Sequence, residues 1–144
     1  MKANVINEMN LKLPSLSVNE GMARAAVAAF CVQADPSAMD LADVKCAVSE
    51  AVTNCIVHGY RDTVGTIYIT VRLYDGGTVR IDIKDKGCGI PDVKLARQPL
   101  YTTDAENERS GMGFTVMENF CDDLRVRSRP GKGTTVTLLK RLHK

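Results

Sequence analysis

The sequence has little of what marks membrane, zinc-binding or nucleic-acid-binding proteins. No apolar run approaches the length of a membrane span, and the N-terminus has no apolar signal core, so we expect a cytoplasmic protein. The two histidines lie far apart, at His58 and His143, and the five cysteines show no C-x-x-C spacing, which disfavours a zinc site. The net charge is +2 with acidic and basic residues interleaved, which disfavours direct binding of nucleic acid.

The commonest nucleotide-binding motifs are absent as well. The chain has no G-x-x-x-x-G-K-[ST] segment and therefore no P-loop. The G-x-G of Gly87 and Gly89 is followed by Pro91 and a loop instead of a helix, which excludes the dinucleotide-binding turn of a Rossmann domain. The H-R-D catalytic loop of protein kinases does not occur either. A nucleotide site in this chain must therefore be of another kind.

What is present is an order of strands and helices that predicts one domain over residues 1–144. Alternating apolar residues predict strands at Val5–Leu13, Ile67–Leu73, Val79–Ile83, Asp122–Ser128 and Thr134–Leu139. Helical spacing predicts helices from a capping box at Ser17 to about Ala34, from about Met39 to Val57, and after Gly113 with Phe114, Met117 and Phe120 inward. The core-facing residues expected in the first helix are Met22, Ala26, Ala29 and Phe30, with Arg24 roughly opposite them.

The second helix is the element around which the chain is arranged, and a glycine cap at His58-Gly59 is expected to end it. Its apolar stripe consists of Leu41, Val44, Val48, Ala51, Val52 and Cys55. Glu50, Asn54 and His58 are spaced four apart and form one polar file along the edge of that stripe. Burying an unpaired carboxylate or amide costs about 1–3 kcal/mol, so the file needs partners. Either Glu50 and Asn54 form a hydrogen-bonded pair on a solvated helix edge, or the file forms one wall of a polar site.

The strand Val79–Ile83 leads to an acid in an unusual place. Counting by twos along this strand arrives at Asp85, which therefore takes a core-facing position at the strand's end. Gly87 and Gly89 follow, and glycines there permit a ligand to approach the backbone closely. The alternative is that Asp85 caps its own glycine turn, which is a common arrangement.

The segment from Asp92 to about Ser110 has no periodicity and is longer than ordinary connections, which predicts a mobile lid over about residues 92–110. The lid leads into Gly111 and Gly113 at the start of a helix. Free backbone N–H groups at a helix start are a natural seat for phosphates.

Taken in order, these segments resemble the ATP site of the GHKL superfamily, which includes gyrase, Hsp90, histidine kinases and MutL. The motifs are E-x-x-x-N-x-x-x-H-G from Glu50, D-x-G-x-G from Asp85, the lid, G-x-G-F from Gly111, and G-K-G-T-T from Gly131. The resemblance implies a Bergerat fold, an α/β two-layer sandwich with helices on one face of a mixed, mostly antiparallel sheet. It also implies ATP and Mg²⁺ as cofactors.

The resemblance implies a role for each matching position. Asn54 matches the asparagine that coordinates magnesium, and Asp85 matches the aspartate that accepts a hydrogen bond from the adenine amino group. Glu50 resembles a general base for an incoming serine hydroxyl, and Arg109 is the candidate for steadying charge on the transferred phosphoryl group. The other positions implied to bind the nucleotide are Gly87, Gly89, Thr103, Ser110, Gly111, Gly113 and Thr134.

The sequence around these motifs is similar to that of the sporulation anti-sigma F factor family, over Asn19–Phe30, Ala96–Thr103 and Arg109–Asp122. That resemblance implies a protein that binds sigma F and, as a serine kinase, phosphorylates an anti-anti-sigma factor. The related anti-sigma kinase of the general stress response is the nearest alternative. An ATP-gated binding module without transferase activity is an alternative of another class. A histidine-kinase fragment is disfavoured, because no dimerisation helix with an acceptor histidine precedes the ATP site.

The same resemblance implies the protein's contacts with its partners. Arg24 matches the family arginine that touches both the sigma factor and the anti-anti-sigma factor. Periodicity alone leaves Arg24 as either a solvated surface residue or a docking residue. A homodimer is also implied, formed through the region of the first strand and helix.

Overall fold

The computed structural model describes residues 4–98 and 113–144, which contain a five-stranded sheet. The strands are β1 (Val5–Pro14), β2 (Thr66–Tyr74), β3 (Thr78–Asp85), β4 (Asp123–Arg129) and β5 (Gly133–Arg141). They lie in the order β1-β2-β3-β5-β4, and each of the four neighbouring pairs is antiparallel. The predicted strands are confirmed, and the expected mixed sheet is antiparallel at every described pairing.

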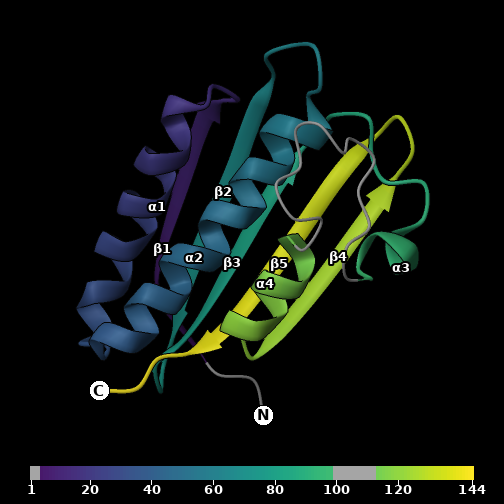
Figure 1. Ribbon diagram of the computed structural model, residues 1–144. Helices are drawn as coiled ribbons and strands as arrows, with labels where there is room; N and C mark the ends of the chain where they lie inside the picture. The colour runs from purple at the N-terminus through teal and green to yellow at the C-terminus, as the bar shows by residue number, and fades with distance from the viewer. Residues whose placement is uncertain (1–3, 99–112) are drawn as a thin grey trace.

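The helices form the second layer. They are α1 (Val18–Cys31), α2 (Ala38–Asn54), the short α3 (Val93–Ala96) and α4 (Gly113–Phe120). Figure 1 shows α1, α2 and α4 on one face of the sheet, so the predicted α/β two-layer sandwich is confirmed. No helix within the described ranges is long and apolar enough to cross a membrane.

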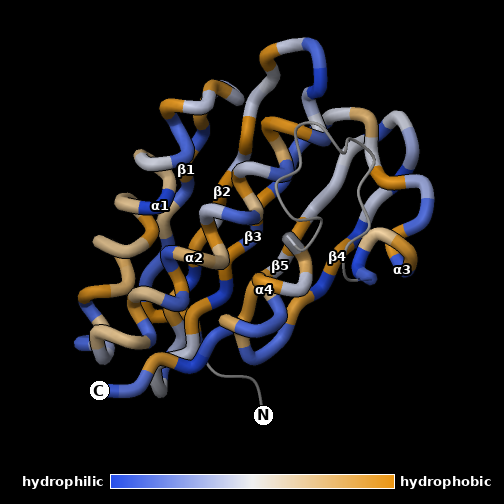
Figure 2. Tube along the Cα trace, viewed as in Figure 1, coloured by the Kyte–Doolittle hydropathy of each residue, from blue (hydrophilic) through white to orange (hydrophobic). Residues whose placement is uncertain are grey.

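The core lies between the two layers. Along β2, Ile67, Ile69 and Val71 are buried while the residues between them are half-exposed, as the alternation predicts. The same alternation runs along β3 and ends at the buried Asp85. Figure 2 shows apolar positions along the sheet strands beneath the helices. The polar end of β3 is therefore fixed by the same register that builds the core.

The orientation of α1 differs from the prediction by about one residue. Ala23, Val27 and Cys31 are its fully buried side chains, whereas Met22 is 58% exposed. Ala29, also expected inward, is exposed. The helix has many alanines and a weak apolar contrast between its faces, so small residues could be assigned to either side. Its small buried side chains let α1 pack closely against α2.

The start of α1 also differs from the predicted capping box. The Ser17 hydroxyl makes no capping hydrogen bond, and Ser17 itself has helical backbone angles. The Asn19 side chain instead donates to the Pro14 carbonyl at 2.9 Å, which fixes the helix to the end of β1. At α2 the Ser37 hydroxyl accepts from the Asp40 N–H at 3.1 Å, a normal N-cap.

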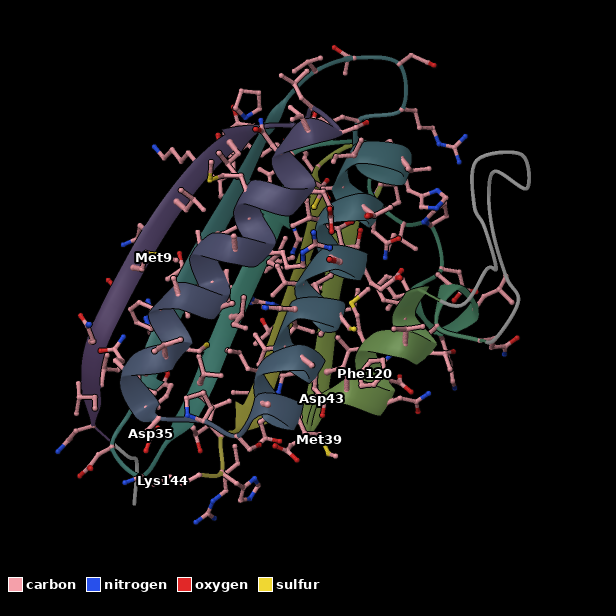
Figure 3. The ribbon with its side chains drawn as sticks, turned by 60° about the vertical axis from the view of Figure 1, so that its left-hand side comes forward. Met9, Asp35, Met39, Asp43, Phe120 and Lys144 are labelled. Atoms are coloured by element: carbon pink, nitrogen blue, oxygen red, sulfur yellow. The ribbon has the colours of Figure 1, made fainter. Side chains whose placement is uncertain are left out.

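The end of the chain returns to the start of α2. The Ser37 N–H donates to the His143 carbonyl at 2.6 Å, and the His143 N–H donates to Asp40 Oδ2 at 2.7 Å. Figure 3 shows Lys144 at the same end of the molecule as Asp35 and Met39, which flank this helix start. β5 and α2 are thus joined at the end of the domain away from the polar file.

Candidate functional site

The polar file that begins on α2 ends at His58, within a wider helical turn that follows the helix. After α2 the chain forms a π-helical turn, Cys55–Gly59, closed by a bond of 2.9 Å from the Tyr60 N–H to the Cys55 carbonyl. The predicted left-handed glycine cap is wrong, because Gly59 has no positive φ. A methyl group at Gly59 would instead lie 2.8 Å from the carboxyl carbon of Asp85. Gly59 is therefore required by the close approach of that acid.

Asp85 is the buried acid of the site, with 4% of its surface exposed. Its Oδ1 accepts from the Gly87 N–H at 2.9 Å, and it also accepts from the Thr134 N–H and the Cys55 thiol. Burial raises the pKa of Asp85 above its ordinary value even though these three donors lower it. The glycine-turn alternative therefore holds locally, but the turn does not account for the placement of the acid against a cavity.

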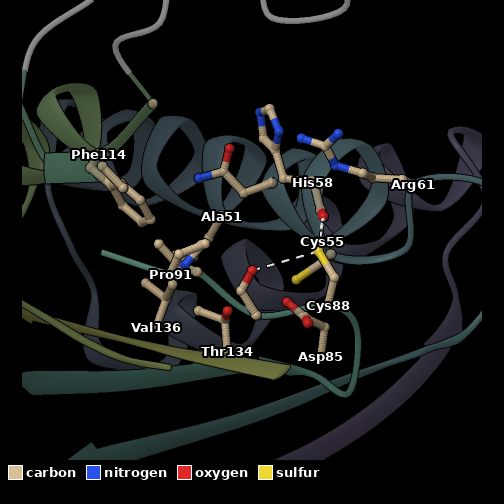
Figure 4. A pocket seen from close by; sticks show the side chains of 16 residues that line it. Ala51, Cys55, His58, Arg61, Asp85, Cys88, Pro91, Phe114, Thr134 and Val136 are labelled. Carbon is tan, nitrogen blue, oxygen red and sulfur yellow. Dashed lines mark hydrogen bonds between the residues drawn. The ribbon is translucent and has the colours of Figure 1, made fainter. Parts of the chain in front are cut away.

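That cavity has a volume of about 270 Å³ and lies between α2, the strand ends and the start of α4. It is lined by Ala51, Asn54, Cys55, His58, Gly59, Arg61, Asp85, Cys88, Gly89, Ile90, Pro91, Ala96, Gly113, Phe114, Thr134 and Val136. Figure 4 shows its apolar side at Val136 and Phe114, and a hydrogen bond from the Cys88 thiol to the His58 carbonyl. A mostly apolar cleft with a few convergent polar groups is the usual form of a small-molecule site.

Asn54 and Glu50 meet the start of α4. A methyl group placed at Gly113 would lie 3.3 Å from both amide atoms of Asn54 and 3.6 Å from Glu50 Oε2. The first backbone N–H groups of α4 and the Asn54 amide are therefore close together, with no side chain between them. N–H groups at a helix start suit phosphates, and an amide oxygen suits a hard cation.

Gly87 and Gly89 lie against backbone. A methyl group at Gly87 would be 2.0 Å from the Gly59 carbonyl oxygen, and one at Gly89, where φ is +76°, would be 2.1 Å from the Arg129 carbonyl oxygen. Packing inside the protein is enough to require both glycines. Gly89 also lines the cavity.

Thr134 lies at the start of β5, opposite Asp85 in the β3–β5 ladder, and lines the cavity. Its hydroxyl lies 2.8 Å from the Ser128 hydroxyl, which also accepts from the Ile90 N–H at 2.7 Å. Ser128 thus joins the glycine segment to β4 and β5. The sequence analysis missed Ser128, because nothing in its strand distinguishes it from a solvated serine.

Tyr60 and Arg61 were missed too, although both directly follow the H-G of the central motif. The Tyr60 hydroxyl donates to the Thr66 carbonyl and accepts from the Lys86 N–H, both at 2.7 Å. It therefore connects the start of β2 to the glycine segment. Their position beside the motif was the available signal.

A second hollow, with a volume of about 600 Å³, lies outside the cavity, between α1, α2 and α4. We call it the helix groove; it is lined by Arg24, Ala42, Lys45, Cys46, Ser49, Glu50, Val116 and Phe120. Arg24 Nη1 lies 3.4 Å from Glu20 Oε1 and 3.4 Å from the Ser49 hydroxyl on α2. Arg24 is exposed, as expected for a residue roughly opposite the inward face of α1, but it also contacts Ser49 of α2 and lines the helix groove.

Several predicted residues lie outside the described ranges. These are Thr103, Arg109, Ser110 and Gly111, together with most of the predicted lid. Of the lid, residues 92–98 are described and contain α3, which Asp92 caps by accepting from the Leu95 N–H at 3.0 Å.

Comparisons with known proteins show the family. The model of the histidine kinase-like ATPase domain family matches residues 13–140. The chain is 54% identical to an anti-sigma F factor of Bacillus licheniformis over 139 residues, covering 96% of this chain and 94% of that protein. It is 52% identical to the anti-sigma F factor of Bacillus subtilis strain 168, with the same coverage. It is also 52% identical to that of a Thermoanaerobacter species, covering 93% of both.

A solved structure confirms the fold. The chain superposes with a TM-score of 0.69 on the crystal structure of the RsbU and RsbW domains of Rv1364c from Mycobacterium tuberculosis. The identity is 21%, and the match covers 96% of this chain and 33% of that one. With the near-complete match to curated relatives at over half identity, the chain belongs to the anti-sigma F factor family and carries a histidine kinase-like ATPase domain.

Proposed function

We propose that this protein binds sporulation sigma F and, as an ATP-dependent serine kinase, phosphorylates an anti-anti-sigma factor. The observation that carries the kinase proposal is the position of Glu50 and Asn54. They are one turn apart on α2, yet Asn54 lines the cavity and Glu50 lines the helix groove. The phosphoryl donor and the acceptor hydroxyl can therefore arrive from opposite sides of one short polar file.

The nucleotide end of the proposal rests on the cavity. Asp85 at its base is a hydrogen-bond acceptor for the adenine amino group, and the apolar lining suits the flat faces of a purine. At the other end, the nearness of Asn54 to the start of α4 supports binding of Mg²⁺ and phosphates there. Among residues 4–98 and 113–144 no group of three or more acidic, histidine or cysteine side chains could hold a metal ion. Magnesium would therefore take its other ligands from phosphate and water, as it commonly does.

The remaining assignments within the nucleotide site stay proposals. We propose that Gly87, Gly89 and Thr134 form the nucleotide-binding frame. We assign phosphate binding by Thr103, Ser110, Gly111 and Arg109, and charge stabilisation by Arg109, to a lid over about residues 92–110. The whole of residues 1–144 then acts as one ATP-binding domain.

Glu50 is proposed as the general base. Its carboxylate is half-buried and faces a groove open enough to admit a peptide segment. A base must lie within hydrogen-bond reach of the proton it removes, and Glu50 lies beside the start of α4, where the phosphates are expected. A protein that only binds ATP would have no need of an acid at this junction.

Arg24 is proposed as the residue that touches both protein partners. It lies on the rim of the helix groove, about half-exposed, with its guanidinium held between Glu20 and Ser49. We expect Arg24→Glu to lose binding of sigma F and of the anti-anti-sigma factor while ATP affinity is kept. Co-purification with each partner, and an ATP titration of the variant, measure the two effects. Full retention of both partners would refute the assignment.

The homodimer is proposed to form through β1 and α1. The outer edge of β1 has no strand paired to it in the described sheet. The outward face of α1 carries Val18 and Met22, and Val32 directly follows the helix; all three are more than half exposed, and Ile6 on β1 is 60% exposed. An open strand edge beside an apolar helix face is a ready surface for a second copy. Because a sigma factor acts where transcription takes place, we also propose a cytoplasmic location.

The experiment that tests the kinase is transfer of labelled phosphate from ATP to the anti-anti-sigma factor. Glu50→Gln should keep ATP affinity and lower the transfer rate by about 100-fold or more, because it removes the base and keeps the shape. Glu8→Gln, a matched change on β1 far from the site, should transfer at the normal rate. If Glu50→Gln transfers normally, Glu50 is not the base. If the unaltered protein binds ATP but transfers nothing, the protein is an ATP-gated binding module.

A further inference from the structure

Arg61 has no role in the family resemblance or in the proposed kinase step, yet it lines the nucleotide cavity. It follows Tyr60, the residue after the π-helical turn, in the exposed loop that leads to β2. Of the described residues around the cavity, Arg61 carries the one side chain with a permanent positive charge. Because it is exposed and also lines the cavity, it lies at the cavity's rim.

The position of Arg61 separates it from the expected phosphate end. Figure 4 shows Arg61 and Phe114 at opposite ends of the cavity. Phe114 is the second residue of α4, so the helix start and the adjoining Asn54 amide mark the phosphate end. In the same view Arg61 lies away from α4, along the edge of the cavity opposite to Asp85 and Cys88. A nucleotide whose base reaches Asp85 would therefore place its nucleoside half, and not its phosphates, nearest to Arg61.

We propose that Arg61 binds the nucleoside half of the nucleotide, its planar guanidinium covering the open side of the adenine ring at the rim. Arginine stacks on aromatic faces, and every purine offers one. The lining of the cavity is mostly apolar and includes Val136, Ile90 and Pro91. The base is then held between an apolar wall and a cation, while Asp85 reads its edge. This inference rests on the proposed ATP site and adds a residue to it.

The test is a calorimetric titration of the full chain with ATP, ADP, AMP and adenosine. Arg61→Gln should weaken all four ligands by the same factor, about 3- to 10-fold, because the lost contact is common to all of them. Arg61→Lys should recover less than half of that loss in log affinity, since it keeps the charge and loses the plane. Arg125→Gln, an exposed arginine on β4 ion-paired to Asp123, is the matched control and should change nothing.

The alternatives give different results. A loss that is largest for ATP and absent for adenosine would assign Arg61 to the phosphates and overturn the inference. Unchanged affinities in Arg61→Gln would also overturn it, while leaving the ATP site intact. If the unaltered protein binds none of the four ligands, the proposed ATP site itself fails and this inference fails with it.

Discussion

The fold and the proposed function favour different protonation states of Asp85. The fold buries it at the end of a core strand, and that burial raises the pKa of its carboxyl group, so ionising it works against the folded state. The proposed function needs the same group as an acceptor facing adenine. Three donors, the Gly87 N–H, the Thr134 N–H and the Cys55 thiol, compensate part of the cost. The site is thus maintained against the preference of a buried acid to stay neutral.

This conflict predicts how stability depends on pH. A carboxyl group whose folded pKa is raised binds its proton more tightly in the folded than in the unfolded chain. Its contribution to the free energy of unfolding therefore falls as pH rises from about 3.8, the ordinary value, through the folded pKa. Urea unfolding of the nucleotide-free protein and of Asp85→Asn over this range measures the effect. The stability of the unaltered protein relative to the variant should decrease with pH, and an increase would contradict the assignment.

Gly59 gives a second prediction at the same scale. In Gly59→Ala the new methyl group would overlap the Asp85 carboxylate, which has to move. We expect a loss of about 1–3 kcal/mol in the free energy of unfolding and a weaker affinity for ATP. Gly21→Ala on α1 is the matched control, because its methyl group has room and the helix gains propensity, which should stabilise by up to about 1 kcal/mol. Thermal unfolding and nucleotide titration of both variants measure these effects. Equal stability and equal ATP affinity of the two variants would contradict the close approach of Gly59 to Asp85.

The sequence predicted individual site residues well where a register or a spacing defined them. Asp85 follows from counting along a strand, and the file of Glu50 and Asn54 follows from helical spacing. Ser128 could not be found this way, because it contacts a segment that is distant in the chain. Arg61 could not be found either, because it lies in a loop, where neither a strand register nor a helical spacing applies. The reason that Gly59 must be glycine likewise appears only when β3 and the end of α2 are brought together.

Among the elements, α2 is fixed at both ends. At its end, Gly59 and Cys55 contact Asp85 of β3. At its start, Lys140 of β5 is almost buried, and its ammonium lies 3.4 Å from Asp43 and 3.7 Å from Asp40. A helix held this way keeps Glu50 and Asn54 at a constant position relative to the sheet.

The Lys140 cluster predicts a stability effect without a direct effect on the site. Lys140→Met keeps the apolar stem but leaves two acids without their cation, so the free energy of unfolding should fall by about 1–3 kcal/mol. The hydrogen bond from the His143 N–H, helped by the nearby lysine, lowers the pKa of Asp40. A carboxyl group whose pKa is lowered in the folded state stabilises the protein above its unfolded pKa. This stabilisation is lost as the pH falls through the folded pKa. The difference in the free energy of unfolding between Lys140→Met and the unaltered protein should therefore become smaller at acidic pH.

Urea unfolding at neutral pH and below pH 4 measures this effect. Lys144→Met, an exposed terminal lysine, is the control and should unfold like the unaltered protein. An unchanged midpoint for Lys140→Met would show that the cluster does not hold the helix.

Elements with strong periodicity were predicted nearly to the residue, and the weakly patterned ones were not. The strands and α2 have long apolar series, whereas α1 is rich in alanine and was assigned a face shifted by one residue. The π-helical turn after α2 was missed because its sequence, Cys55–Gly59, also fits an ordinary helix end. Its wider path is set by the contact with Asp85 and by Tyr60, which are tertiary features.

For the whole molecule, the apolar outer face of α1 and the free edge of β1 predict self-association. Met22→Glu with Val18→Lys places charges on that face without touching Arg24 or the cavity. We expect the double variant to sediment as a monomer at concentrations where the unaltered protein is a dimer, with ATP affinity changed less than about twofold. Analytical ultracentrifugation measures the mass. A double variant that dimerises normally would place the interface elsewhere.

Under the proposed function, the two hollows on either side of α2 would make the molecule a junction between a nucleotide and a protein partner. Because Glu50, Asn54 and Gly113 are in mutual contact range, a nucleotide in the cavity and a segment in the helix groove would share one wall. The central claim of the proposed function is that adenine lies against Asp85.

The most direct test of that claim is a calorimetric titration of ATP, with magnesium, into the unaltered protein and into Asp85→Asn. We predict clear binding by the unaltered protein and a loss of affinity of about 10-fold or more in the variant, since a buried acceptor is replaced by a group that also carries donors. The variant should remain folded by circular dichroism. Equal affinity of the two proteins for ATP would contradict the placement of the base, and with it the proposed site.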